Sequence, residues 1–340
     1  MSTPIALTTT YLGLRLAHPF MVGASPLAFD LDSVKRLEDG GSSAIVLHSL
    51  FEEQISLALS GRIHQMDPFE KQFAGALAGY PEHYALSPDG YLEHIRKVKA
   101  AVGVPVIASL NGMTPETWLQ FAVRIDQAGA DALELNMYAV ATDPGEIGAV
   151  IERDLRNVVF ELKHHLRLPI AVKMTPFFTA FADVAHQLDR AGADGLVMFN
   201  CFYQPDIDID RMAAVPRLEL STNEELLLRL RWTALLHSQL RCSLAITGGV
   251  ATPADGIKAI LAGADAVQMV SAILRHGPAY FSKMRDGLLR WMESKEVTSL
   301  DEVRGRIDGS TADADVVERA NYLRTLQSWR PALEDEPRRR

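Results

Sequence analysis

The stretch Ser243–Leu274, SLAITGGVATPADGIKAILAGADAVQMVSAIL, indicates the fold of the whole chain. It contains two apolar runs of strand length, Leu244–Thr247 and Ala266–Val270. Between them, Pro253–Ala262 has apolar residues at helical spacing. Parallel strands need such a crossover, so the stretch predicts a strand, a helix and a second strand parallel to the first.

The same stretch indicates a phosphate site. Gly248 and Gly249 directly follow the first strand, where the lack of a side chain lets the backbone approach a ligand closely. Ser271 follows the second strand and opens another helical segment. Backbone N–H groups and a hydroxyl in this arrangement form a phosphate cradle, which lies after strands seven and eight in α/β barrels. The alternative is that the glycines only turn the chain.

A repeat extends this unit along the chain. The sequence AGAD occurs at 128–131, 191–194 and 262–265, and each copy leads into an apolar run. Each copy is typical of a helix end, a glycine cap and a buried strand, and their repetition is typical of a barrel. The apolar runs give eight expected strands, at 20–23, 44–48, 104–109, 132–136, 170–174, 195–200, 244–247 and 266–270. We therefore predict an α/β fold, a (β/α)8 TIM barrel.

Other segments complete the expected barrel. Leu7–Leu16 alternates and contains a turn glycine, which predicts a hairpin over the barrel floor. Long connections at 51–102, after the second strand, and 202–241, after the sixth, are typical of active-site lids. We expect helices across 278–329 and a disordered charged tail at 331–340, which leaves residues 1–330 as one domain.

Composition excludes several classes of protein. The net charge of −9 argues against a nucleic-acid partner. The two cysteines, Cys201 and Cys242, form neither a disulfide framework nor a metal-ligand cluster, so we expect no metal site and a reducing, cytoplasmic setting. The chain lacks an apolar run of about 18 residues and an N-terminal targeting pattern, so we expect no association with a membrane.

Polar residues gather where the expected strands end, which in this fold is the catalytic face. They are Ser25, His48, Ser49, Ser109, Asn111, Asn136, Lys173, Asn200 and Thr247. Lys173 closes an otherwise apolar strand, and a buried ammonium needs an acceptor or anion beside it. It is a functional candidate, with an ion pair to an acidic neighbour or a snorkelling lysine as the alternatives. The amides of Asn136 and Asn200 suit recognition of a planar heterocycle, and structural capping is their alternative.

The motifs GASP, ASLNGM, ELNM, VKM, MFN, ITGGV and QMVSA stand in this order between Pro19 and about Met292. In order and spacing they resemble the dihydroorotate dehydrogenase family, whose members are FMN-binding (β/α)8 barrels. The resemblance implies that Gly249 and Ser271 hold the FMN phosphate, that Ala24 and Ser25 approach the flavin ring, and that Lys173 stabilises the reduced flavin. The expected cofactor contacts are Ala24, Ser25, Ser49, Asn111, Asn136, Lys173, Asn200, Thr247, Gly248, Gly249 and Ser271.

The sequence departs from the family pattern on the substrate side. Ala139 stands where the family carries a Cys or Ser base, Ala141 replaces an asparagine, and His48 replaces a lysine at the end of the second strand. The family's substrate-binding motif is missing from the loop after strand two, and PRLELSTNEELL replaces the glycine-rich loop after strand six. We therefore expect the flavin half of the site to be retained and the substrate to differ from dihydroorotate.

Several residues are candidates for the lost proton transfer. His48 ends its expected strand near the flavin and has a suitable ordinary pKa, and Tyr138 adjoins the missing base. Weaker candidates are His83 and Tyr84 on the expected lid and a Cys201 thiolate. For each of these residues, packing in the core or on a lid is the alternative.

The predicted function is that of an FMN-dependent oxidoreductase, a homodimer connected with pyrimidine metabolism. It would exchange hydride between flavin N5 and a C–C bond of a small, planar, dihydropyrimidine-like substrate, with an electron acceptor that can be a protein. Lys173, His48 and Tyr138 are the catalytic candidates. Two alternatives stay open: an FMN-binding electron-relay subunit without its own catalysis, and a flavin-free sugar-phosphate lyase or isomerase on the same barrel.

Overall fold

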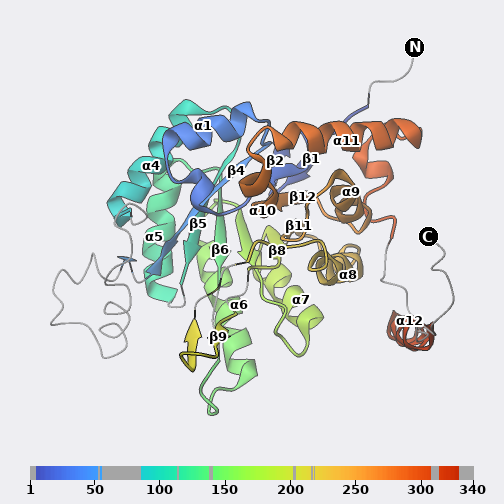
Figure 1. Ribbon diagram of the computed structural model, residues 1–340. Helices are drawn as coiled ribbons and strands as arrows, with labels where there is room; N and C mark the ends of the chain where they lie inside the picture. Colours follow the sequence, from blue (N-terminus) through green and yellow to red (C-terminus); the bar gives the residue numbers. More distant parts are fainter. Residues whose placement is uncertain are drawn as a thin grey trace.

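The computed structural model describes residues 5–52, 54–55, 86–112, 115–137, 141–201, 204–215, 217, 219–307 and 314–328. Eight strands close into a barrel in the order β3, β4, β5, β6, β7, β8, β11, β12, and every neighbouring pair is parallel (Figure 1). The predicted (β/α)8 barrel is confirmed.

The barrel strands are β3 (Phe20–Val22), β4 (Ile45–Phe51), β5 (Val106–Asn111), β6 (Ala132–Asn136), β7 (Ile170–Lys173), β8 (Gly195–Met198), β11 (Ser243–Thr247) and β12 (Ala266–Met269). The helices are α1 (Leu31–Asp39), α4 (Pro88–Ala101), α5 (Pro115–Ala128), α6 (Gly148–His165), α7 (Phe181–Ala191), α8 (Leu226–Leu236), α9 (Pro253–Leu261), α10 (Ser271–His276), α11 (Tyr280–Ser294) and α12 (Ala314–Ser328). Among the described residues, 3₁₀ turns lie at Pro26–Ala28 and Leu300–Glu302.

The AGAD repeat joins neighbouring strands at the barrel floor. Its aspartates accept hydrogen bonds from the backbone of the adjacent strand: Asp131 from Val106 N, Asp194 from Ile170 N and Asp265 from Leu244 N, at 2.7–2.8 Å. The glycine of each copy has a φ between +90° and +111°, a conformation that residues with a Cβ rarely adopt. The repeat therefore fixes both the end of a helix and the register of the following strand.

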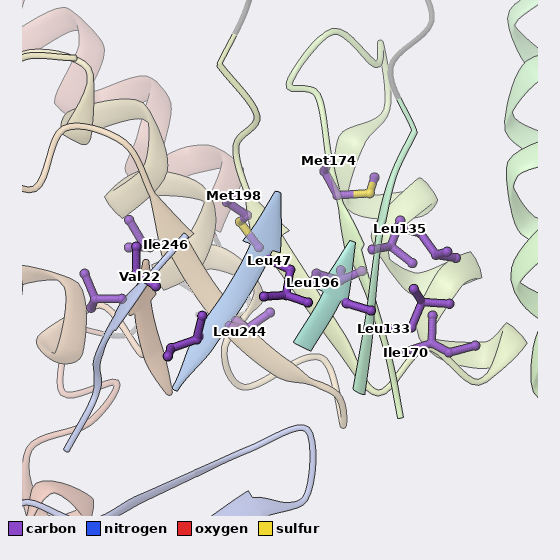
Figure 2. Packing of buried hydrophobic residues seen from close by; sticks show 14 of the residues in the cluster. Val22, Leu47, Leu133, Leu135, Ile170, Met174, Leu196, Met198, Leu244 and Ile246 are labelled. Carbon is purple, nitrogen blue, oxygen red and sulfur yellow. The ribbon is translucent and has the colours of Figure 1, made fainter. Parts of the chain in front are cut away.

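Because side chains alternate along the barrel strands, the apolar residues form two cores, one between the strands and the helices and one inside the barrel. Outward-facing residues such as Leu133, Leu135, Leu196 and Ile246 pack under the helices (Figure 2). A second, inner cluster takes one residue from each barrel strand: Met21, Val46, Ile107, Ala132, Ala171, Val197, Ala245 and Ala266. Because side chains alternate, the residues two positions further on also face inward. They form the next layer of the barrel interior.

Two hairpins lie outside the barrel. The N-terminal pair, β1 (Thr9–Tyr11) and β2 (Leu14–Leu16), is the predicted one, and its Tyr11 and Leu16 pack on the inner cluster. The second pair, β9 (Asp206–Asp208) and β10 (Ala213–Val215), falls in the connection after β8, where we expected a lid. Most of the other expected lid, at 51–102, and the tail at 331–340 lie outside the described residues.

Candidate active site

The second inner layer of the barrel is polar and contains the predicted lysine. The Lys173 Nζ atom donates to Glu134 Oε1 at 3.1 Å, and Gln268 Nε2 donates to Glu134 Oε2 at 2.5 Å. The side chains of Lys173 and Glu134 are 6% and 1% exposed. Lys173 thus has the acidic neighbour that a buried ammonium requires. β6, β7 and β12 supply this network, each from the position two residues beyond the inner apolar cluster.

Amides and hydroxyls surround this ion pair. Asn200 Nδ2 donates to Asn136 Oδ1 at 2.9 Å, so the two predicted asparagines meet. Asn136 pairs in register with Lys173 on one side and with Asn111 on the other. These neutral donors and acceptors lie at the carboxyl ends of the strands, where ligands bind in α/β barrels.

The β4 strand is longer than predicted, and this changes the position of His48 in the strand. We expected the strand to end at His48, but β4 continues to Phe51, and its register with β5 shifts between Val46 and Ser49. The extra residue gives the inward position to Ser49, whose hydroxyl lies 2.8 Å from the Ser109 hydroxyl. The expectation that His48 ends its strand is wrong.

His48 belongs to an aromatic cluster. Its ring lies 5.0 Å from that of Phe29, 5.2 Å from Tyr91 and 5.9 Å from His94 between centroids. Burial, together with the neighbouring His94, lowers the pKa of His48 to about 4. The imidazole is therefore neutral at pH 7 and a weak base. Its buried Nδ1 atom has no hydrogen-bond partner among the described residues.

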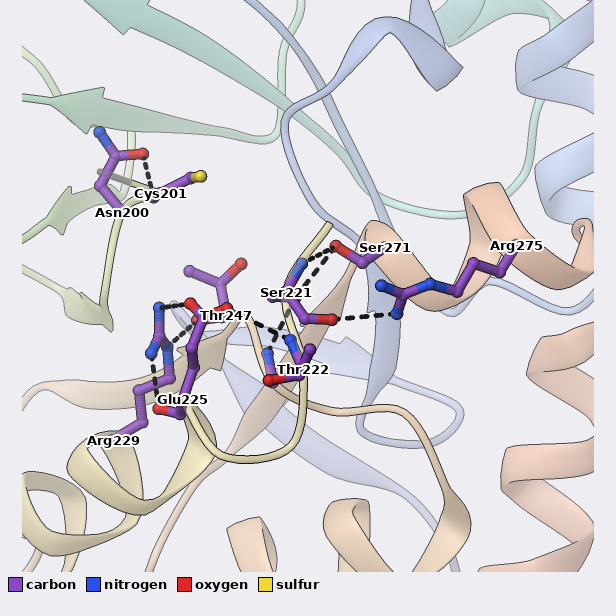
Figure 3. Close-up of polar contacts among 10 residues, drawn as sticks. Asn200, Cys201, Ser221, Thr222, Glu225, Arg229, Thr247, Ser271 and Arg275 are labelled. Carbon is purple, nitrogen blue, oxygen red and sulfur yellow. Dashed lines mark hydrogen bonds and ion pairs between the residues drawn. The ribbon is translucent and has the colours of Figure 1, made fainter. Parts of the chain in front are cut away.

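A cluster of hydrogen-bond donors lies at the ends of β11 and β12 (Figure 3). Ser271 Oγ accepts from Ser221 N at 3.1 Å and lies 3.0 Å from Ser221 Oγ, and Gly249 N donates to Ser221 Oγ at 3.1 Å. Arg275 donates to the carbonyls of Ser221 and Leu220 at 3.0 and 2.8 Å. Two backbone N–H groups, two hydroxyls and a nearby guanidinium are the donor set that binds a phosphate.

Both glycines of this loop are required by geometry. Gly248 and Gly249 have φ of +87° and +78°. A Cβ at Gly249 would lie 2.6 Å from Leu226 N, and one at Gly248 would lie 2.8 Å from the Arg229 guanidinium. Arg229 is buried and donates from Nε to the Thr247 carbonyl at 2.5 Å, which holds the end of β11. The loop is thus packed tightly against α8.

Other predicted residues fall in different places. Ser25 is buried and donates to the Gly23 carbonyl at 3.1 Å, and Ala24 packs on the inner cluster. Burial raises the pKa of the Cys201 thiol, and Glu225 raises it further, which disfavours a thiolate at neutral pH. Tyr138, Ala139, His83 and Tyr84 lie outside the described residues. Within the described ranges, no three His, Cys, Asp or Glu side chains are grouped to hold a metal.

Four residues of the site were not predicted: Glu134, Gln268, Ser221 and Arg275. Glu134 is a charged residue in the apolar strand ALELN, two positions before Asn136 and therefore on the same face, and this spacing could have identified it. Gln268 has the same kind of signal in β12. Ser221 lies 50 residues from Ser271 in a loop without regular structure, and no sequence pattern places it at the phosphate cluster.

Comparison with known proteins identifies the family. A family model described as dihydroorotate dehydrogenase matches residues 87–292, more than half of the chain. The chain belongs to the dihydroorotate dehydrogenase family. It is accordingly an oxidoreductase of the dihydroorotate dehydrogenase type.

The relatives in this family include subunits of larger enzymes. The dihydroorotate dehydrogenase B (NAD(+)) catalytic subunit of Methanothermobacter thermautotrophicus is 27% identical over 307 residues, covering 88% of this chain and 97% of the relative. The NAD-dependent dihydropyrimidine dehydrogenase subunit PreA of Escherichia coli K12 is 24% identical over 337 residues, covering 92% and 80%. The dihydroorotate dehydrogenase B catalytic subunit of Pyrococcus abyssi is 31% identical over 224 residues, covering 64% and 73%.

Among the helices that the structure describes, none has the length and apolar character needed to cross a membrane.

Proposed function

We propose that this member of the dihydroorotate dehydrogenase family binds FMN and exchanges a hydride with a C–C bond of a small, planar, dihydropyrimidine-like substrate. The observation that carries the proposal is the pairing of two features in one barrel mouth. One is the donor cluster of Gly249, Ser221 and Ser271. The other is the buried Lys173 with the Asn136–Asn200 amide pair.

The donor cluster fits the FMN phosphate. The Ser221 and Ser271 hydroxyls and the Ser221 and Gly249 N–H groups bond to one another at 3.0–3.1 Å, so all of them are within reach of one small anion. The Arg275 guanidinium, which donates to the Ser221 carbonyl, adds a positive charge next to these donors. A phosphate dianion would accept from several of these donors at once. A sugar phosphate could be bound by the same donors.

The residues around Lys173, which would lie against the flavin ring, favour a flavin over a sugar phosphate. FMN supplies the hydride chemistry at its ring nitrogen N5. Lys173 would place its ammonium beside the N1/O2 side of the ring, and Ala24 and Ser25 would lie against the ring. A Schiff-base lysine needs a nitrogen that is free to attack a carbonyl, whereas Lys173 Nζ is held in a buried ion pair with Glu134 Oε1 at 3.1 Å.

The groups near the ring suit an uncharged amide-bearing substrate. Asn136 and Asn200 each offer an amide donor and acceptor, and Ser49 and Ser109 offer hydroxyls. A dihydropyrimidine presents the complementary N–H and C=O edges. His48 is neutral at pH 7 because burial lowers its pKa to about 4, so this position lacks the cation of the family's lysine, which would attract a carboxylate.

We propose that electrons pass between the flavin and a protein partner. The relatives from M. thermautotrophicus and E. coli are both named as subunits of NAD-dependent enzymes. Because this chain is similar to them over 88–92% of its length, we expect it to exchange electrons with a nicotinamide through a comparable partner.

An anaerobic titration tests the substrate assignment. Protein reconstituted with FMN is mixed with dihydrouracil, which is uncharged, and separately with dihydroorotate, which carries a carboxylate. We expect the flavin absorbance to bleach with dihydrouracil and to persist with dihydroorotate. Bleaching by dihydroorotate alone would contradict the proposed substrate class, and failure to retain FMN would contradict the cofactor assignment.

A further inference from the structure

Glu134 is a buried carboxylate without an assigned role. It is buried in the barrel interior, and both of its oxygens have partners, Lys173 Nζ at 3.1 Å and Gln268 Nε2 at 2.5 Å. Desolvation of a buried ion pair often cancels its Coulombic gain, and an apolar pair of similar size can be equally stable. The stability of the fold therefore does not explain why this position carries a charge.

The carboxylate changes the electric field at the barrel mouth. An isolated ammonium presents a full positive charge, whereas an ammonium with a carboxylate 3.1 Å away presents a dipole whose potential falls faster with distance. The two amides beside this ion pair, Asn136 and Asn200, are neutral and add no positive charge. Burial raises the pKa of Tyr11, and the Glu134 charge raises it further, so this phenol also stays neutral.

We propose that Glu134 is a positioning residue that fixes the Lys173 ammonium and lowers the reduction potential of the bound flavin. The inference rests on the proposed FMN binding. Lys173 would hold the part of the flavin ring that gains negative charge on reduction, and the Glu134 carboxylate behind the ammonium would make that charge less favourable. The lowered potential favours transfer of hydride from flavin to a C=C bond over the reverse reaction.

The substitution Glu134→Gln removes the charge and keeps the shape. The glutamine oxygen can still accept from Lys173. The –NH2 group of the introduced glutamine would face the Gln268 side chain, whose buried Oε1 has no hydrogen-bond partner among the described residues. Rotation of the Gln268 amide by a half-turn would then supply an acceptor.

The experiment measures the ratio of reduced to oxidised flavin in equilibrium with a reference redox dye. We expect Glu134→Gln to raise this ratio at least tenfold, which for a two-electron couple is about 30 mV. Lys173→Met should lower it by a similar factor. Asp255→Asn is the matched control, because Asp255 is a buried carboxylate that caps α9 and has no part in the Lys173 network. It should leave the ratio within about twofold of wild type.

The outcomes separate the inference from the proposed function. If wild-type protein takes up no FMN, the proposed function fails and the inference fails with it. If FMN binds but Glu134→Gln leaves the ratio unchanged, only the inference is overturned, and Glu134 is a structural residue. If Glu134→Gln does not fold, Lys173→Met is compared with Lys173→Met/Glu134→Gln. A tenfold higher ratio in the double variant supports the inference, and equal ratios overturn it.

Discussion

Loss of the Lys173 ammonium should destabilise the protein strongly even without a ligand. The substitution Lys173→Met keeps most of the side-chain volume and leaves Glu134 buried without its cation. At 3.1 Å and an effective dielectric constant of about 20, the lost Coulombic attraction is about 5 kcal/mol. Removal of one partner from a buried pair typically costs about 3–5 kcal/mol, and we expect a loss in this range.

The assay is urea unfolding of the FMN-free protein at pH 7.5, followed by circular dichroism. Lys163→Met is the matched control. The Lys163–Asp194 pair is shorter, at 2.6 Å, but its side chains are 21% and 34% exposed, so its loss should cost about 1 kcal/mol or less. Lys173→Met/Glu134→Gln should recover part of the loss, because no buried charge is left unpaired. A Lys173→Met variant no less stable than Lys163→Met would refute this reasoning.

Two further predictions concern single residues. Because burial lowers the pKa of His48 from 6.5 to about 4, its stabilising contribution is complete above pH 6.5 and disappears as the pH falls to 4. Between pH 7.5 and 5.0, wild type should lose about 2 kcal/mol more of its unfolding free energy than His48→Leu, and equal losses in urea titrations would contradict the lowered pKa. Gly129→Ala should cost about 1 kcal/mol, since its φ is positive and its Cβ would meet nothing within 4 Å, and Gly249→Ala should cost more, since its φ is also positive and its Cβ would lie 2.6 Å from Leu226 N. Only Gly249→Ala, whose Cβ would meet Leu226, should weaken FMN binding tenfold or more in a flavin-fluorescence titration, and equal affinities in the two variants would argue against the cradle.

The barrel was predictable because its signals are local. Each AGAD copy combines a glycine with a φ of +90° or more and an aspartate that accepts from the preceding barrel strand, so a four-residue pattern reports both a helix end and a strand start. Gly248 and Gly249 were recognisable for the same reason, because two glycines directly after an apolar run indicate a turn with positive φ or a close approach of the backbone to a ligand.

The unpredicted parts depend on register and on distant segments. The shift in β4 exchanges the places of His48 and Ser49, and a one-residue shift leaves no mark on an apolar pattern. Ser221 reaches Ser271 from a loop 50 positions away. Glu134 meets Gln268 only because the barrel interior brings β6 and β12 within reach of each other.

The central claim is that the cluster of Ser221, Gly249 and Ser271 binds the phosphate of FMN. The most direct test compares the affinities of FMN and riboflavin for the purified protein, because the two ligands share the ring and differ in the phosphate. Hydrogen bonds to a charged group contribute about 1.5–3 kcal/mol each, so FMN should bind at least a hundredfold more tightly. Equal affinities, or no binding of either ligand, would contradict the account.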